Sequence, residues 1–172
     1  MIKREITGTL LQLAKEFPIV TVTGPRQSGK TTATKSAFAN KPYVSLEELD
    51  VRNYANKDPR GFLTQFPDGA ILDEIQRAPD ILSYLQTIID ADGRNGLFIL
   101  TGSHQIELTR EINQSLAGRT GLLTLLPLSI RELKKDDQEL LEVDQQLITG
   151  FYPRIYKENS NPTNFYRAYL KT

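Results

Sequence analysis

A glycine-bounded loop constrains the fold of this chain more than any other sequence feature. Residues 24–31 read Gly-Pro-Arg-Gln-Ser-Gly-Lys-Thr and match the pattern G-x-x-x-x-G-K-S/T in full. The loop follows the apolar run 19–23, which predicts a buried strand, and opens a helical pattern that starts at Gly29. A chance glycine turn is the alternative interpretation, but the strand–loop–helix context favours a phosphate-binding loop.

The spacing of the loop explains the chemistry that it predicts. Gly24 and Gly29 allow backbone angles and a close approach that a side chain would block. The helix beginning near Gly29 offers free N–H groups and the positive end of its dipole. Lys30 would place a compact positive charge on the β- and γ-phosphates, and the Thr31 hydroxyl is a hard oxygen ligand for Mg²⁺. The predicted nucleotide-binding residues are Gly24, Pro25, Arg26, Gln27, Ser28, Gly29, Lys30, Thr31 and Thr32.

Apolar runs and helical patterns alternate along the chain. Further strands are predicted at 43–46, 70–72, 97–101 and 121–126, and helices at 3–16, 47–66, 105–116 and from Pro79 onward. The strands are continuous apolar runs, which is typical of a parallel sheet covered on both faces. The predicted fold is therefore α/β, with three layers around a five-stranded parallel sheet.

The alternation does not continue through the C-terminal part. Ser129 and Glu132 have the spacing of a capping box, which predicts one more helix start. Two further helices are predicted beyond it, the second over residues 163–171. The expected division is a P-loop core at 1–133 and a helical extension at 134–172.

Two carboxylates follow the third predicted strand. Asp73 and Glu74 stand at its carboxyl end, the edge where open α/β sheets bind ligands. Asp73 would hold Mg²⁺ through its water shell, and Glu74 would orient the attacking water or take its proton. A solvated strand end or a helix cap is the alternative. The phosphate-binding loop disfavours that alternative, because the two motifs predict each other's position.

The fourth predicted strand ends in polar residues. In a sheet of this kind the strand beside the first one often carries a polar side chain toward the γ-phosphate, and Ser103 is the candidate, with Thr101 as its rival. Either residue could instead simply terminate the strand. His104 is the single histidine of the chain, and we assign it no role.

Arg119 precedes the fifth predicted strand. It could contact a phosphate in its own chain, or reach a neighbouring subunit as an arginine finger. A surface or ion-paired arginine is the alternative. Arg26 and Arg77 are closer in sequence to the predicted site, and either could contact phosphate or brace Asp73.

Composition narrows the function classes. Lys plus Arg number 21 and Asp plus Glu number 21, so the net charge of zero gives no clear nucleic-acid signal. The absence of cysteine removes disulfides and thiolate metal sites. No apolar run approaches the roughly 20 residues of a membrane span, and we expect a cytoplasmic protein. The guanine-reading Asn-Lys-x-Asp pattern is missing, which favours ATP.

Several segments together resemble one family. They are Gly-Pro-Arg-Gln-Ser-Gly-Lys-Thr-Thr at 24–32, Leu-Asp-Glu-Ile-Gln-Arg at 72–77, Leu-Thr-Gly-Ser at 100–103, Ser-Leu-Ala-Gly-Arg at 115–119, Leu-Pro-Leu-Ser-Ile-Arg-Glu at 126–132 and Gly-Phe-Tyr-Pro-Arg at 150–154. They are similar to the AAA-type ATPase domain, with its Walker A and B motifs, in a prokaryotic family of uncharacterised ATP-binding proteins. The resemblance implies strand order 5-1-4-3-2 and an ATPase, with a homo-oligomer or a protein partner left open. Such proteins usually continue into a C-terminal domain, so a chain ending at Thr172 is expected to be truncated.

These observations predict an ATPase that uses Mg²⁺ and is coupled to an unknown partner or process. The predicted catalytic residues are Glu74, Lys30, Ser103 and Arg119, and the predicted metal ligands are Thr31 and Asp73. A nucleotide-binding switch with negligible hydrolysis is the alternative. A small-molecule kinase fits less well, because the acidic pair suits water activation and no arginine-rich lid segment is evident.

Overall fold

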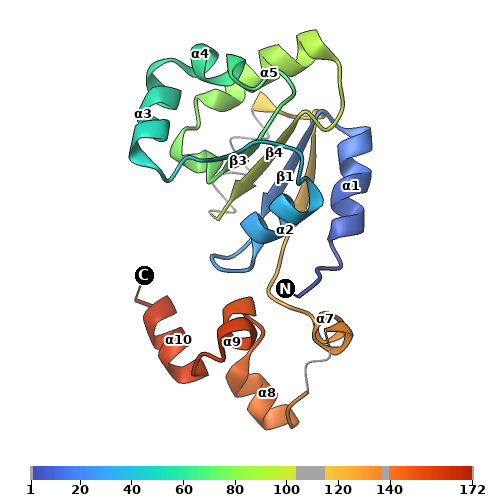
Figure 1. Ribbon diagram of the computed structural model, residues 1–172, viewed down its shortest axis with the longest axis vertical. Helices are drawn as coiled ribbons and strands as arrows, with labels where there is room; N and C mark the ends of the chain where they lie inside the picture. Colours follow the sequence, from blue (N-terminus) through green and yellow to red (C-terminus); the bar gives the residue numbers. More distant parts are fainter. Residues whose placement is uncertain (1, 104–114, 137–139, 172) are drawn as a thin grey trace.

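The computed structural model describes residues 2–103, 115–136 and 140–171, and a single parallel sheet stands at its centre (Figure 1). Its strands are β1 (Ile19–Thr23), β2 (Tyr43–Ser45), β3 (Ile71–Asp73), β4 (Phe98–Gly102) and β5 (Thr120–Thr124). They lie in the order β2-β3-β4-β1-β5, and each neighbouring pair is parallel. This is the predicted order 5-1-4-3-2 read from the opposite edge, so the predicted fold is confirmed.

Helices connect the strands and follow them. Those between strands are α2 (Lys30–Ala37), α3 (Leu49–Lys57), α4 (Pro59–Thr64), the 3-10 helix η1 (Ile75–Arg77) and α5 (Ile81–Asp92), and α1 (Thr7–Glu16) precedes β1. After β5 come α7 (Ile130–Lys135), α8 (Val143–Thr149), α9 (Pro153–Glu158) and α10 (Pro162–Tyr169).

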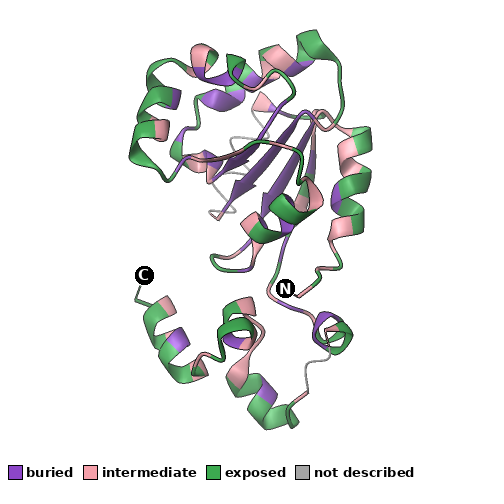
Figure 2. Cartoon of the chain, in the orientation of Figure 1, coloured by how far each residue is buried: buried purple, intermediate pink, exposed green. Residues whose placement is uncertain are grey.

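The sheet carries one apolar cluster on each face, because successive side chains of a strand point to opposite sides. On one face Val20 and Val22 pack with Leu10 of α1 and Ala33 of α2. On the other face the cluster combines strand residues with α3, α4 and α5, and Leu85 of α5 is one of its fully buried members. Figure 2 shows the central strands β1, β3 and β4 as the most continuously buried part of the chain. The continuous apolar runs predicted burial on both faces, which is observed for β1, β3 and β4, whereas the edge strands β2 and β5 are only partly buried.

Several predicted helix bounds differ from the observed ones. The first helix begins at Thr7 rather than at residue 3, because Arg4 takes part in a buried polar network described below. Pro79 lies outside α5, in a turn just before it, where its carbonyl oxygen accepts from the Leu82 amide at 3.0 Å. The helix α9 was not predicted, because its six residues are too few for a periodic pattern. The predicted helix at 105–116 lies largely outside the described residues, as does His104.

The helices α9 and α10 lie beyond the carboxyl ends of the strands, on the side of the sheet where the β1–α2 loop is found (Figure 1). None of the helices in the described ranges combines the length and the apolar character that a membrane crossing requires. The carboxyl edge of the sheet is therefore where the candidate site is built.

Candidate functional site

The loop between β1 and α2 has the backbone that its glycines predicted. Gly24 has φ +146° and Gly29 has φ +95°, and Gln27 between them also has a positive φ of 59°. A Cβ added at Gly24 would collide with the backbone oxygen of Leu125, the residue after β5. Gly24 is thus required both by its angles and by the close approach of a neighbouring segment.

Lys30 lies at the first position of α2 with its side chain folded over the loop. Its Nζ donates to the carbonyl oxygens of Gly24 at 3.0 Å and Pro25 at 2.9 Å, and only 5% of the residue is exposed. Burial lowers the pKa of Lys30, although the nearby carboxylates of Glu74 and Asp73 act in the opposite direction. Lys30 is therefore a buried cation held beside two acidic side chains at the mouth of the loop.

Asp73, at the end of β3, is buried and surrounded by hydroxyl groups. Thr31 Oγ1 lies 3.1 and 3.0 Å from its two carboxylate oxygens, the Tyr43 hydroxyl donates to Oδ2 at 2.7 Å, and Thr101 Oγ1 also donates to the carboxylate. The structure therefore brings together the two residues predicted as metal ligands. Burial and the adjacent carboxylate raise the pKa of the Tyr43 phenol.

Tyr43 is a site residue that sequence reasoning missed. It lies on β2, which pairs with β3 so that Tyr43 is opposite Ile71, two residues before Asp73. The signal was the strand order implied by the family resemblance, which makes β2 the neighbour of β3. Ser45 is opposite Asp73 in this register, and Tyr43, two residues earlier, lies on the same face of β2, which makes its hydroxyl a candidate partner for Asp73.

Glu74 follows β3 in a left-handed conformation with φ +58°, which is uncommon for a residue other than glycine. Ser103 Oγ donates to Glu74 Oε2 at 2.7 Å, and Gln76 Nε2 donates to the same oxygen. The Glu74 amide in turn approaches Thr101 Oγ1 at 3.4 Å. Ser103, predicted to face a phosphate, is thus brought to the carboxylate of Glu74.

Arg119 lies at the amino ends of the strands, whereas the phosphate loop lies at their carboxyl ends. It immediately precedes β5, and its guanidinium forms a two-pronged ion pair with Asp90 of α5, at 2.7 and 2.9 Å. A five-residue strand at about 3.3 Å per residue separates the two edges by roughly 15 Å. The structure therefore does not bring Arg119 to the loop of its own chain. The arginine finger directed at a neighbouring subunit stays a prediction.

Arg26 and Arg77, the other two arginines considered, are both exposed, as is Thr32 at the start of α2. Arg26 is close enough to Lys30 to help lower its pKa. Arg77 ends η1.

Two adjoining cavities open at the loop, and α9 contributes to both. One, of about 390 Å³, is lined by Lys30, Thr31 and Glu74 on one side and by Arg154 and Lys157 of α9 on the other. The second, of about 380 Å³, is lined by Ile2, Leu128, Pro153, Tyr156 and other residues, and shares Gly29 and Thr32 with the first. The basic residues of α9 are a further part of the site that sequence reasoning missed.

The oxygen donors at the loop fit Mg²⁺ better than a transition metal. Across the described ranges there is no group of three or more His, Cys, Asp or Glu side chains arranged to hold a metal ion. Thr31 and Asp73 provide one hydroxyl and one carboxylate within hydrogen-bonding distance of each other. Mg²⁺ is usually held by one or two such protein oxygens, with waters and phosphate oxygens completing its shell.

A five-stranded parallel sheet in this order, with a G-x-x-x-x-G-K-T loop after β1 and a carboxylate ending β3, defines a P-loop nucleotide-binding fold. Residues 16–134 match the family described as AAA domain, and the chain belongs to that family. Among curated proteins it is 28% identical over 160 residues to the uncharacterized proteins Mb2031c of Mycobacterium bovis and Rv2008c of Mycobacterium tuberculosis. The alignment covers 92% of this chain but 35% of those proteins, so the chain spans about a third of their length.

Solved structures share the fold at low sequence identity. The Walker-type ATPase PABY2304 of Pyrococcus abyssi superposes with a TM-score of 0.60 at 14% identity, covering 99% of this chain and 72% of that one. AMPPCP-bound DnaA from Aquifex aeolicus superposes with a TM-score of 0.58 at 16% identity, covering 90% and 57%. These similarities establish the architecture of the sheet and the helices.

Proposed function

We propose that this chain binds ATP with Mg²⁺ and hydrolyses it. The observation that carries the proposal is the meeting of Thr31 and Asp73, 3.0 Å apart, with Lys30 and Glu74 lining the adjacent cavity. Membership of the AAA family supports nucleotide binding independently. We infer that hydrolysis is coupled to a partner protein or to a second copy of the chain, and that it takes place in the cytoplasm. We also infer that residues 1–133 form the P-loop core and residues 134–172 a helical extension.

The two cavities divide the nucleotide between them. Lys30 and the N-terminus of α2 offer positive charge and N–H donors, which suit the phosphates. Part of the wall of the adjoining cavity is apolar, formed by Ile2, Leu128 and Pro153, and this part suits the flat, weakly polar face of a base. Since the two cavities meet at Gly29, one nucleotide can extend from one into the other.

Thr31 and Asp73 would hold the metal ion, which when bound neutralises charge on the phosphate oxygens. Tyr43 and Thr101 donate to Asp73 and fix the direction of its carboxylate. Hydrogen bonds of this kind orient the ligands in many metal sites.

Glu74 is the group proposed to act on water. A carboxylate beside the phosphate cavity can orient a water molecule and accept its proton as the water attacks. Ser103 and Gln76 donate to one oxygen of Glu74 and hold it in place, which leaves the other oxygen for the water. Ser103 then contributes by positioning Glu74.

Arg154 and Lys157 on α9 face the same cavity as Lys30. Two more cations near the phosphates would offset the negative charge of a triphosphate, which exceeds what Lys30 alone balances. Arg154 is paired with Glu158 at 2.8 Å on an exposed helix face, and this pair would exchange for a phosphate contact.

The test is the rate of ATP turnover with Mg²⁺ by the purified chain and by Lys30→Ala and Glu74→Gln, with nucleotide binding measured in parallel. Lys57→Ala and Glu48→Gln, both exposed and outside the site, are matched controls. We expect Lys30→Ala to lose binding and Glu74→Gln to bind ATP but lose turnover, with unchanged controls. A turnover rate in Glu74→Gln equal to that of the wild-type chain would refute the role of Glu74. A wild-type chain that binds ATP but does not hydrolyse it would favour the nucleotide switch.

A further inference from the structure

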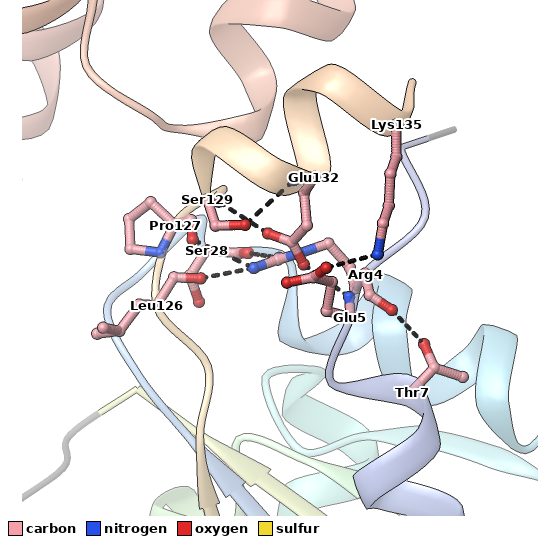
Figure 3. A network of polar contacts seen from close by, with 9 residues as sticks. All are labelled: Arg4, Glu5, Thr7, Ser28, Leu126, Pro127, Ser129, Glu132 and Lys135. Carbon is pink, nitrogen blue, oxygen red and sulfur yellow. Dashed lines mark hydrogen bonds and ion pairs between the residues drawn. The ribbon is translucent and has the colours of Figure 1, made fainter. Parts of the chain in front are cut away.

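The guanidinium of Arg4 joins three segments that are far apart in the sequence (Figure 3). Its Nη1 donates to the carbonyl oxygen of Ser28 in the phosphate loop at 2.6 Å. Its Nη2 donates to the carbonyl oxygens of Leu126 at 2.7 Å and Pro127 at 3.3 Å, in the connection from β5 to α7. One side chain from before α1 thus fixes the loop against the segment that leads out of the sheet.

Glu132 is the ionic partner of Arg4, and both of its carboxylate oxygens accept hydrogen bonds. Oε1 accepts from Arg4 Nε at 2.9 Å and from the Glu5 amide at 2.8 Å, and Oε2 accepts from the Ser129 amide at 2.8 Å. Since the Glu132 amide also donates to Ser129 Oγ, the predicted capping box of α7 is confirmed. The start of α7 and the N-terminal segment are therefore held by the same carboxylate.

The pair is buried, which makes each partner depend on the other. The side chains of Arg4 and Glu132 are 9% and 5% exposed. A buried charge left without its partner is costly, so removing one member of such a pair is strongly destabilising. Arginine suits this place because its planar fork donates in several fixed directions, whereas lysine offers one compact charge.

The contact with Ser28 sets the direction of the peptide that follows. In a trans peptide the carbonyl of one residue and the N–H of the next point in opposite directions. Holding the Ser28 carbonyl toward Arg4 therefore turns the Gly29 N–H away from it. Gly29 is also the N-cap of α2, in the left-handed region, so its amide direction is not set by the helix itself.

We propose that Arg4 is a positioning residue for nucleotide binding, and that its ion pair with Glu132 couples the state of the phosphate loop to α7 and the helices after it. The inference rests on the proposed function. The Arg4 guanidinium keeps the Gly29 N–H in the direction needed to donate to a phosphate. A movement of α7 displaces Glu132, and through the ion pair it also displaces Arg4 and the loop. Coupling of this kind acts in both directions, so a bound nucleotide also stabilises the start of α7.

The experiment compares Arg4→Gln, Arg4→Lys and Glu132→Gln with the wild-type chain. Lys135→Gln is the matched control, because it breaks the neighbouring ion pair with Glu5, at 2.6 Å, without touching the loop. Amide hydrogen exchange is measured over residues 24–31 and 129–135 without nucleotide, and ATP affinity is measured by calorimetry. Thermal unfolding reports the general stability of each variant.

We expect Arg4→Gln to speed exchange over 24–31 and weaken ATP binding, each by about tenfold, the effect of losing a hydrogen bond that involves a charged group. Arg4→Lys should lie between Arg4→Gln and wild type, and Lys135→Gln should match wild type. The double variant Arg4→Gln/Glu132→Gln should weaken binding by less than the two single changes combined, because both remove one interaction.

Exchange and affinity within about twofold of wild type in Arg4→Gln, less than 0.5 kcal/mol in binding, would overturn the proposal. Faster exchange that extends equally across β1 and β4 would also overturn it, because it would indicate a general structural role. If the wild-type chain binds no ATP, the proposed function fails by itself. The exchange data on the free protein then still decide whether Arg4 fixes the loop and whether Glu132 transmits that restraint to α7.

Discussion

At the scale of single residues, the candidate site depends on hydroxyl groups that orient carboxylates. Thr31, Tyr43 and Thr101 surround Asp73, and Ser103 holds Glu74. The sequence motifs identified the two carboxylates and the Thr31 hydroxyl, because these belong to a contiguous pattern. Tyr43 could not be assigned in that way, since its contact with Asp73 arises only when β2 pairs with β3.

Tyr43→Phe tests the role of the phenol. Removing this hydroxyl deletes one hydrogen bond to Asp73 without changing the shape of the ring, so the carboxylate is less firmly directed toward the metal. We expect the Mg²⁺ concentration for half-maximal turnover to rise by about three- to tenfold, corresponding to the loss of one charge-assisted hydrogen bond. Tyr54→Phe, on exposed α3, is the control. An unchanged Mg²⁺ requirement in Tyr43→Phe would remove Tyr43 from the site.

At the scale of elements, a comparison of two glycines distinguishes two reasons why a side chain would destabilise the fold: an unfavourable backbone angle and a steric clash. Gly69 before β3 and Gly93 after α5 have φ of +77° and +75°. A Cβ at Gly69 would run into the backbone oxygen of Leu97, whereas a Cβ at Gly93 would meet nothing within 4 Å. The two positions therefore differ in their surroundings and agree in their conformation.

We expect Gly69→Ala to lower the free energy of unfolding by at least about 2 kcal/mol more than Gly93→Ala, because it adds a clash with the backbone of Leu97, just before β4, to the same conformational strain. Denaturant unfolding of both variants gives the difference. Equal losses would mean that the strand β3 shifts easily to make room.

The capping box of α7 makes a pH-dependent contribution to stability. Burial acts to raise the pKa of Glu132, but the Ser129 and Glu5 amides and Arg4 outweigh it, so the pKa falls below its ordinary value of 4.5. A carboxylate with a lowered folded-state pKa stabilises the protein above its unfolded pKa, and loses that contribution as the pH falls through the folded value.

Glu132→Gln should therefore be less stable than wild type at neutral pH, with a gap that shrinks as the pH falls below about 4.5. Thermal unfolding between pH 7 and acidic pH follows this gap, with Glu48→Gln as an exposed control. A gap that is constant over the whole range would show that the charge of Glu132 does not contribute.

At the scale of the whole molecule, sequence patterns were sufficient for the sheet and insufficient for its surroundings. The central strands β1, β3 and β4 are buried throughout, as their apolar runs indicated, whereas the edge strands β2 and β5 are only partly covered. The family resemblance supplied the strand order. The placement of α9 opposite the phosphate loop depends on contacts across the whole chain, and its short length left no periodic signal. Arg119 illustrates the same limit. The sequence allowed it to contact a phosphate in its own chain, but the structure pairs it with Asp90, away from the loop.

Arg119 tests whether the site needs a second copy of the chain. If Arg119 reaches a neighbouring subunit, ATP turnover per chain should increase with protein concentration, and Arg119→Ala should remove that increase while leaving ATP affinity unchanged. Arg94→Ala, which removes an exposed arginine that is also paired with an aspartate, is the control. Turnover of Arg119→Ala that rises with concentration as in wild type would exclude the arginine finger.

The contact between Arg4 and Glu132 also has a consequence for the order in which the chain is made. The two residues are 128 positions apart, so on the ribosome Arg4 is synthesised roughly 6 to 26 s before its partner, at about 5–20 residues per second. The loop itself is complete early in that interval, but the side chain that restrains Ser28 has no counter-ion until the fifth strand and the following turn have emerged. With Arg4 acting as proposed, a nascent chain therefore binds nucleotide more weakly until the start of α7 has been made.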